Sequence, residues 1–454
     1  MNGRVQTMPA SMAMPATGRA PWGFAEWFAI SQTALPAILI MPGTQAFRLP
    51  IRISAFGISL AAFVWYVFNA KGKVRQSQAQ SWVFAVMALL AVMLVHPSTP
   101  SFTGGLAQLA VYFAVMTPLF WAPWFVDSPE RLARIMWILL VCSGINSIVG
   151  VLQVYDPDRW LPAEFSRVML SQSMGLGPVS FIGRNGQMTI RPPGLFDTPG
   201  SVAGPASYAA LLGLVFTVSR SPAWKRLLAL VFAGAGLAAI YLSEVRISWA
   251  VTLGMLLVYS VTLSRQGKFG RATQFSILAG GIFVGSFILA VALGGQQISD
   301  RFMTLFAADP LTVYRDARGA HLDATFGTLL IEHPFGAGLG RWGMAASYFG
   351  TFSQQNPAMW AEIQLAGWML DGGILMIILY GGALIVTAIA EWKVAMVADH
   401  PRLATCGAVV LAANLGTAAM IFSFTPFVAQ MGIQYWFLAG ALHGVGVRNG
   451  IDGA

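Results

Sequence analysis

The fold class is decided by long apolar stretches, of which residues 366–390 are a clear example. They read AGWMLDGGILMIILYGGALIVTAIA, with Asp371 as the only charged side chain. The hydrocarbon core of a bilayer is about 30 Å thick and a helix rises about 1.5 Å per residue, so a run of this length can cross it. We therefore expect a membrane-spanning helix here.

Similar apolar runs, bounded by charges or by Pro and Gly, occur along the rest of the chain. They predict an all-α polytopic membrane protein with about 12 transmembrane helices in a single domain, residues 21–446. Residues 1–20, rich in Met, Ala, Pro and Gly, are predicted to form a disordered tail, and 447–454 a second tail. The twelve predicted spans are 24–41, 53–70, 82–96, 105–126, 135–154, 201–218, 227–243, 247–263, 274–293, 366–390, 404–424 and 427–446.

The composition supports the same class. The 454 residues are 56% hydrophobic and only 10% charged, whereas a soluble domain carries about 25% charged residues. This excludes a cytosolic enzyme, a disordered scaffold and a secreted domain. Cys142 and Cys406 both lie in apolar stretches, so they predict neither a disulfide framework nor a metal site.

The net charge of +9 is explained by topology. Cytoplasmic loops of membrane proteins collect Lys and Arg, and a cytoplasmic N-terminus places the basic loops of this chain on that side. Both termini are then cytoplasmic, and the surplus charge predicts no nucleic-acid partner. The basic loop residues are Lys71, Lys73, Arg75, Arg131, Arg134, Arg220, Lys225, Arg226, Arg265, Lys268, Arg271, Lys393, Arg402 and Arg448.

On this topology two long connections, about 155–200 and 294–365, face the exported side. Long loops in a compact protein are usually functional. Every Lys or Arg on this side is an arginine, and a guanidinium binds phosphate oxygens with two hydrogen bonds. The alternative is that these arginines meet lipid headgroups or nearby carboxylates. They are Arg48, Arg52, Arg159, Arg167, Arg184, Arg191, Arg246, Arg301, Arg315, Arg318 and Arg341.

Two segments place an arginine where the chain enters the membrane. Residues 191–200 read RPPGLFDTPG and begin with Arg191, and residues 242–249 read LSEVRISW and hold Glu244 and Arg246. Ionisable residues at such a depth are costly unless they are paired or functional. We expect Arg191 to be carried at the outer surface of the bilayer and Arg246 to face a cavity there. A stiff loop and a structural Glu244–Arg246 ion pair are the alternatives.

The second long loop predicts an amphipathic helix. Leu322, Phe326, Leu329 and Leu330 follow a helical period, and Pro334 ends the pattern. Arg318 and His321 are three residues apart, so they can share a site. His321 and His333 form no compact cluster with carboxylates, which argues against a metal site.

Together these motifs resemble the O-antigen ligase and Wzy-type polysaccharide polymerase superfamily. The likeness covers about residues 185–390 and rests on RPPGLFDTPG, SEVRISWA, the arginine and helix before HPFGAGLG, and AEIQLAGWMLDGG. It implies a GT-C-like membrane fold in a bacterial inner membrane, with the active site facing the periplasm, and a donor glycan carried on undecaprenyl pyrophosphate. Arg191 and Arg246 would hold the pyrophosphate, and the helix carrying Arg318 would cover the site.

The resemblance also implies a catalytic base, and here the chain departs from the family. Glu362 stands where the family has a histidine, if Asp371-Gly-Gly is aligned with the family's Glu-x-Gly. An acceptor hydroxyl would attack the anomeric carbon with inversion while Glu362 removes its proton, and Arg191 and Arg246 would stabilise the leaving pyrophosphate. Neither metal nor cofactor is expected. The expected substrate-binding residues are Arg318, Arg315, His321, Glu244 and Arg341.

The acceptor stays open. It is another lipid-linked repeat in a polymerase of O-antigen or exopolysaccharide, which the missing histidine favours, or the lipid A core in a ligase. Other polysaccharide assembly proteins are candidate partners besides the lipid bilayer. A transporter or flippase of lipid-linked glycan is the alternative from another class, as is a non-enzymatic export partner, although the chain shows no internal repeat of the kind common in transporters.

Overall fold

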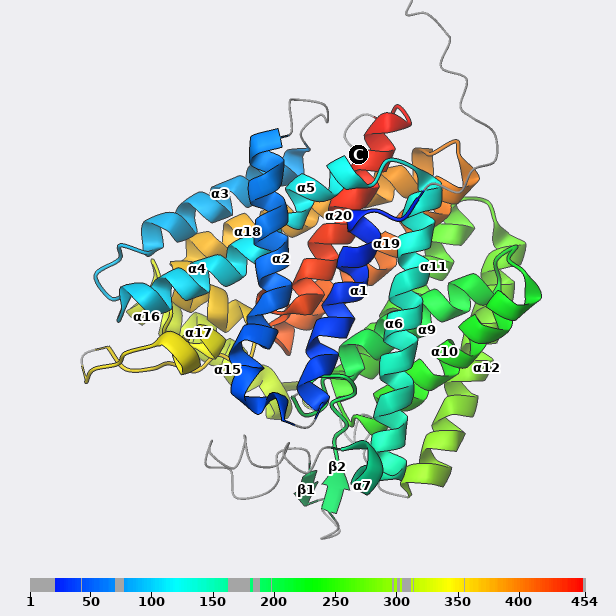
Figure 1. Cartoon of the computed structure of the whole chain (residues 1–454), viewed down its shortest axis with the longest axis horizontal. Helices are drawn as coiled ribbons and strands as arrows, with labels where there is room; N and C mark the ends of the chain where they lie inside the picture. Colours follow the sequence, from blue (N-terminus) through cyan, green and yellow to red (C-terminus); the bar gives the residue numbers. More distant parts are fainter. Residues whose placement is uncertain are drawn as a thin grey trace, which may run out of the picture.

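The computed structural model is a bundle of helices with one small pair of strands (Figure 1). It describes residues 21–451 apart from 42, 70–76, 162–179, 183–187, 197, 296–297, 300–302, 304–311, 313 and 355. The predicted tail 1–20, the end of the second tail and parts of both long loops lie outside the described residues. Strands β1 (Ser180–Ile182) and β2 (Met188–Ile190) pair antiparallel, with Phe181 opposite Thr189.

Most of the described chain is helical. The main helices are α1 (Phe24–Ala37), α2 (Arg48–Asn69), α3 (Gln78–Met93), α4 (Phe102–Met116), α5 (Pro118–Phe125), α6 (Pro129–Tyr155), α7 (Pro157–Trp160), α9 (Ala203–Thr217), α10 (Ala223–Leu242), α11 (Arg246–Arg265), α12 (Phe269–Gly294), α17 (Gly343–Phe349), α18 (Gln364–Val397), α19 (Pro401–Ala419) and α20 (Gln430–Arg448). Short helical turns are η1 (Ile38–Ile40), η2 (Thr44–Phe47), η5 (Met420–Phe422) and η6 (Pro426–Val428).

Among the described residues, eight helices are long and apolar enough to cross a membrane, which agrees with a polytopic membrane protein. Each of the twelve predicted spans overlaps helical residues, although 105–126 is divided between α4 and α5, and twelve crossings stay a prediction. The eight are Arg48–Asn69, Phe102–Phe125, Pro129–Tyr155, Ala223–Leu242, Arg246–Arg265, Phe269–Ala292, Gln364–Val397 and Pro401–Phe422.

Helix α20 is not among the eight because its polar residues make it less apolar, and it lies inside the bundle. Residues 432–446 of this helix are all buried, including Gln434 and His443. The surrounding core is aromatic: Trp368 of α18 stacks on Tyr380 with ring centroids 4.4 Å apart, and Trp436 donates to the Tyr380 hydroxyl at 3.0 Å. A helix enclosed by protein needs no lipid-facing stripe, so polar residues are accommodated along it.

Helix ends that carry basic residues meet at one end of the described bundle, which we call the tail end because α20 finishes there (Figure 1). At the start of α6, Arg131 pairs with Glu26 of α1 at 2.9 Å. The neighbouring Glu130 accepts from Arg402 at the start of α19 at 2.7 Å. Arg448 donates to the Val126 carbonyl at 2.8 Å. These contacts place the ends of four helices side by side, as the charge pattern predicts.

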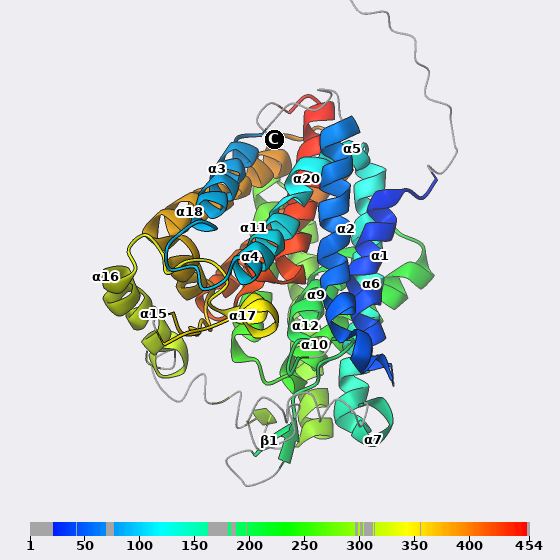
Figure 2. The same cartoon turned by 60° about the vertical axis from the view of Figure 1, so that its left-hand side comes forward.

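The opposite end, here called the loop end, carries α7, the two strands and the second long loop (Figures 1 and 2). This loop contains η3 (Arg315–Gly319), α15 (Ala320–Ala324), η4 (Thr325–Leu329), α16 (Leu330–Glu332) and α17. Tyr314 donates to the Phe422 carbonyl at 3.2 Å, and the Ser101 hydroxyl donates to the Phe349 carbonyl at 3.3 Å. The loop is therefore attached to η5 and to the start of α4.

The predicted amphipathic helix is present, but its buried face is shifted. Two segments, η3 and η4, are π-helical, and each π-turn takes more residues than an α-turn. As a result Thr325 is fully buried while Phe326 is exposed, although Leu322 and Leu329 pack against the core as predicted. The helix ends at Glu332, because a residue before Pro334 is disfavoured in helical conformation.

Helix α18 is interrupted by a kink that receives the glycine-rich turn of the second long loop. Gly373 has φ +64°, and beside it Ile374 donates to the Pro334 carbonyl at 3.0 Å. In the same region the buried Asp371 accepts hydrogen bonds from Tyr112 at 2.7 Å and Trp342 at 2.9 Å. The kink thus fixes the loop against the membrane helices.

We expect Gly373→Ala to destabilise the fold by about 2–4 kcal/mol, because alanine disfavours a positive φ and because its Cβ would collide with the Pro334 backbone. The measurement is the midpoint of thermal unfolding in detergent. Gly381→Ala on the same helix is the control, since a Cβ there meets nothing within 4 Å. An equally stable Gly373→Ala protein would contradict the role of the kink.

Candidate functional site

A cavity of about 670 Å³ opens at the loop end, large enough for a small ligand. Three of the predicted site residues line it: Arg191 from the first long loop, and Arg318 and Glu362 from the second. They come from three separate segments of the chain. Other lining residues include Arg52, Tyr348, Ser248, Gln430 and Gln434 among polar groups, and Leu39, Phe56, Phe424, Val428 and Met431 among apolar ones.

Glu362 is the centre of a polar cluster just before α18. Its Oε2 pairs with the Arg318 guanidinium and lies 3.4 Å from Nε2 of His321. Its Oε1 accepts from Nε1 of Trp360 at 3.2 Å. The predicted one-turn spacing of Arg318 and His321 therefore brings both side chains to one carboxylate, which is fixed on both oxygens and is 30% exposed.

Arg318 keeps its positive charge although it is partly buried. Partial burial lowers the pKa of the Arg318 guanidinium below its ordinary value, while attraction to the Tyr314 hydroxyl raises it. Burial in turn raises the pKa of Tyr314, which favours the neutral phenol. Arginine starts from a pKa above 12, so Arg318 stays charged and can bind an oxyanion in a partly dry site.

Arg191 is carried by a loop that α6 holds in place. Gln153 of α6 makes two hydrogen bonds to the backbone of Gly194, each of 2.8 Å, and Asn146 accepts from the backbone N–H of Leu195. Arg191 Nε donates to the Ser243 carbonyl at 3.5 Å. The loop is thus held firmly, which agrees with the stiff-loop interpretation, and Arg191 also lines the cavity.

Arg246 lies beside the cavity. It is the first residue of α11 and is half-buried between Val245 and Ser248, which both line the cavity, but it is not among the described lining residues itself. Glu244, before it, is buried and has φ +53°, a conformation that costs a non-glycine residue roughly 1–2 kcal/mol. Strain of this kind is typical of functional sites.

Two arginines that were predicted to bind substrate are not among the described residues that line the cavity. Arg315 is exposed and is not among the described residues that line the cavity. Arg341 is buried and donates to the Pro357 carbonyl at 3.0 and 3.1 Å and to the Ala337 carbonyl at 3.2 Å. Backbone carbonyls occupy its guanidinium, so Arg341 joins two parts of the loop and does not contact the cavity.

We expect Arg341→Met to destabilise the protein by about 1–3 kcal/mol, because the buried Ala337 carbonyl and the Pro357 carbonyl lose their donor. Thermal unfolding in detergent measures the loss. Arg402→Met is the control, because its exposed pair with Glu130 contributes at most about 1 kcal/mol. Unchanged stability of Arg341→Met would show that these hydrogen bonds do not hold the loop.

The sequence did not single out Arg52 and Tyr348 as site residues. Arg52 Nη1 donates to the Tyr348 hydroxyl at 2.9 Å, across 296 positions of sequence. Arg52 was one of eleven exported arginines, and the local sequence of α2 does not distinguish it. Only its spacing of four residues from Phe56, which also lines the cavity, could have shown that both share a helix face.

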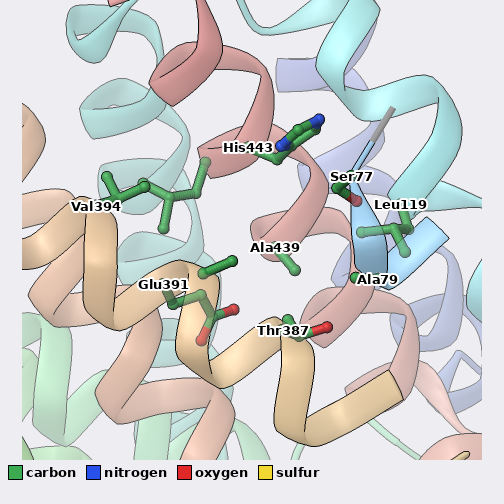
Figure 3. A pocket seen from close by; sticks show the side chains of 10 residues that line it. Ser77, Ala79, Leu119, Thr387, Glu391, Val394, Ala439 and His443 are labelled. Atoms are coloured by element: carbon green, nitrogen blue, oxygen red, sulfur yellow. The ribbon is translucent and has the colours of Figure 1, made fainter. Parts of the chain in front are cut away.

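A second, much smaller cavity lies at the tail end and is shown in Figure 3. Its volume is about 20 Å³ and it is lined by Ser77, Thr387, Glu391 and His443, among others. This is room for about one water molecule, so no sugar or diphosphate fits there. Within the described residues no group of three His, Cys, Asp or Glu side chains is placed to hold a metal ion.

Comparison with known proteins does not identify the chain: no family model and no curated protein matches it. Its function is therefore inferred from the residues around the larger cavity. These residues combine arginines that can bind oxyanions, one fixed carboxylate that can accept a proton, and apolar side chains that can contact a hydrocarbon chain.

Proposed function

We propose that the protein is a membrane glycosyltransferase that joins a glycan carried on undecaprenyl pyrophosphate to an acceptor hydroxyl. The observation that carries the proposal is the convergence of Arg191, Arg318 and Glu362 on one cavity of about 670 Å³. Each was predicted as a site residue from a different segment. An ion pair accounts for the approach of Arg318 and Glu362, but it gives no reason for Arg191 to line the same cavity.

The cavity also suits the parts of such a donor. Leu39, Phe56 and Met431 can contact a prenyl chain, and the arginines can bind the pyrophosphate. Under the positive-inside rule the basic tail end is cytoplasmic, which puts the cavity at the exported side. No nucleotide is available there, so the energy for transfer comes from the sugar–pyrophosphate bond.

In the proposed reaction Glu362 accepts the proton of the acceptor hydroxyl as its oxygen bonds to the anomeric carbon. The bond between that carbon and the pyrophosphate oxygen breaks, and undecaprenyl pyrophosphate leaves with the electron pair. Attack from the side opposite the leaving group gives inversion. Arg191 stabilises the growing negative charge of the pyrophosphate, with Arg246 beside it.

The Arg318–Glu362 ion pair adds a regulatory element to this mechanism. In the resting structure the guanidinium holds the carboxylate that serves as base. A bound pyrophosphate, which carries more negative charge than one carboxylate, competes for Arg318. Once Arg318 binds phosphate, Glu362 loses a stabilising cation and becomes a stronger proton acceptor. The base is then strongest when donor is present.

We further propose the GT-C-like fold with twelve spans, and the polymerase branch over the ligase, because Glu362 replaces the family histidine. The test is a release assay with purified protein in lipid, a lipid-linked glycan and an acceptor. Formation of a longer glycan together with free undecaprenyl pyrophosphate is expected. Movement of the lipid-linked glycan across the membrane with no bond formed would instead favour the transporter, and the acceptor that reacts separates polymerase from ligase.

A further inference from the structure

We propose that Arg52 is a further anion-binding residue of the cavity, that Tyr348 positions it, and that it binds the phosphate attached to the prenyl chain of the donor. The inference rests on the proposed function and deepens it. It assigns the two phosphates of a prenyl pyrophosphate to different arginines, Arg52 on the membrane side and Arg191 and Arg318 on the sugar side.

The geometry around Arg52 is that of a positioned side chain. Its Nη1 donates to the Tyr348 hydroxyl at 2.9 Å, and its guanidinium carbon lies 5.9 Å from the centroid of the Tyr348 ring. Both residues line the cavity. A tyrosine can hold a guanidinium through its hydroxyl and its ring, so this contact orients Arg52.

The surroundings of Arg52 indicate which part of the substrate it meets. Phe56 lies one turn further along α2 and lines the same cavity, as do Pro36 at the end of α1 and Leu39 of η1. Helices α1 and α2 are neighbours in the bundle (Figures 1 and 2). A prenyl chain against this apolar wall would place its own phosphate beside Arg52.

The other charged groups of the cavity come from different elements. Arg191 precedes α9, Arg318 lies in η3 and Glu362 precedes α18. A prenyl pyrophosphate is a linear molecule in which chain, first phosphate, second phosphate and sugar follow in that order. With the prenyl chain at α1 and α2 and the reacting sugar carbon at Glu362, the second phosphate would lie beside Arg191 and Arg318.

The experiment measures binding by calorimetry in nanodiscs of phosphatidylcholine. The probes are farnesyl pyrophosphate, farnesyl monophosphate and inorganic phosphate. Arg52→Gln is expected to lower the affinity for both farnesyl ligands by a similar factor, about 10- to 100-fold. Arg191→Gln is expected to weaken the pyrophosphate more than the monophosphate. Tyr348→Phe, which keeps the ring and loses the hydroxyl, is expected to weaken both by about 2- to 10-fold.

Arg48→Gln is the matched control, because it removes an arginine from the same helix but not from the described lining of the cavity; it should leave both affinities within about twofold. Thermal unfolding checks that each variant is folded. Arg52→Lys, which keeps the charge and loses the fork, replaces Arg52→Gln if the latter does not fold, and should also weaken both farnesyl ligands.

Several outcomes would overturn the inference. If Arg52→Gln binds both farnesyl ligands like the wild type, Arg52 is not a binding residue, although the proposed function survives provided the wild type binds farnesyl pyrophosphate. If inorganic phosphate binds as tightly as farnesyl monophosphate, the site recognises free phosphate and not a lipid-linked one. If the wild type binds no farnesyl pyrophosphate, the proposed function fails as well.

Discussion

Glu362→Gln is expected to lower the turnover number by about 10²- to 10⁴-fold, the usual contribution of a general base. The amide is close in shape to the carboxylate and can still accept the hydrogen bond from Trp360. It cannot take up a proton from the acceptor hydroxyl. Binding of the donor should therefore persist while transfer is lost, and single-turnover release of undecaprenyl pyrophosphate measures the difference.

The control for this variant is Glu332→Gln. Glu332 is an exposed acid at the end of α16 in the same loop, and its loss should leave turnover within about twofold because surface charges contribute little. Wild-type turnover in Glu362→Gln would remove Glu362 from the chemistry. His321, 3.4 Å from the same carboxylate, would then be the next candidate for the base.

Arg191→Lys is expected to lower the turnover number by about 10²- to 10³-fold, similar to the loss of one donor from an oxyanion site. A lysine keeps the charge but loses the planar fork that binds two phosphate oxygens. The loop around it is held by Gln153 and Asn146 of α6, so the shorter reach of the ammonium cannot be compensated by movement of the backbone. Steady-state release of undecaprenyl pyrophosphate gives the turnover number.

Arg159→Lys provides the comparison for Arg191→Lys. Arg159 lies in α7 at the loop end, where it is exposed and its guanidinium carbon lies 6.0 Å from the centroid of the Trp160 ring. It is not among the described residues that line the cavity, so its variant should retain activity. Equal losses in both variants would mean that arginine content at this end matters and that the position of Arg191 does not.

The sequence predicted the helices well and the site in part. Every predicted span overlaps helical residues, with 105–126 divided between α4 and α5, and the predicted site residues Arg191, Arg318 and Glu362 line one cavity. Arg341 was predicted to bind substrate, but its guanidinium donates to the Pro357 and Ala337 carbonyls instead. Phe326 belongs to the apolar pattern of the predicted helix but is exposed, because the π-turns of η3 and η4 shift the buried face of the helix.

What the sequence alone determined is the membrane character of the chain and the placement of its helices. The free energy of transferring a segment into hydrocarbon depends on the residues of that segment, and the hydrogen bonds of its backbone form within the helix. The membrane character and the helix positions can therefore be predicted from each segment by itself. The prediction that the basic loops share one side of the membrane also needs only the sequence, because each crossing places the next loop on the opposite side.

Only the tertiary structure decided which polar residues meet. Arg52 reaches Tyr348 across 296 positions, Arg191 reaches Ser243 across 52, and Arg318 reaches Glu362 from another helical segment. Such contacts depend on how helices are rotated and packed against each other, which is set by many pairwise fits between distant side chains. No single segment contains that information, so the cavity emerges only when the whole bundle is assembled.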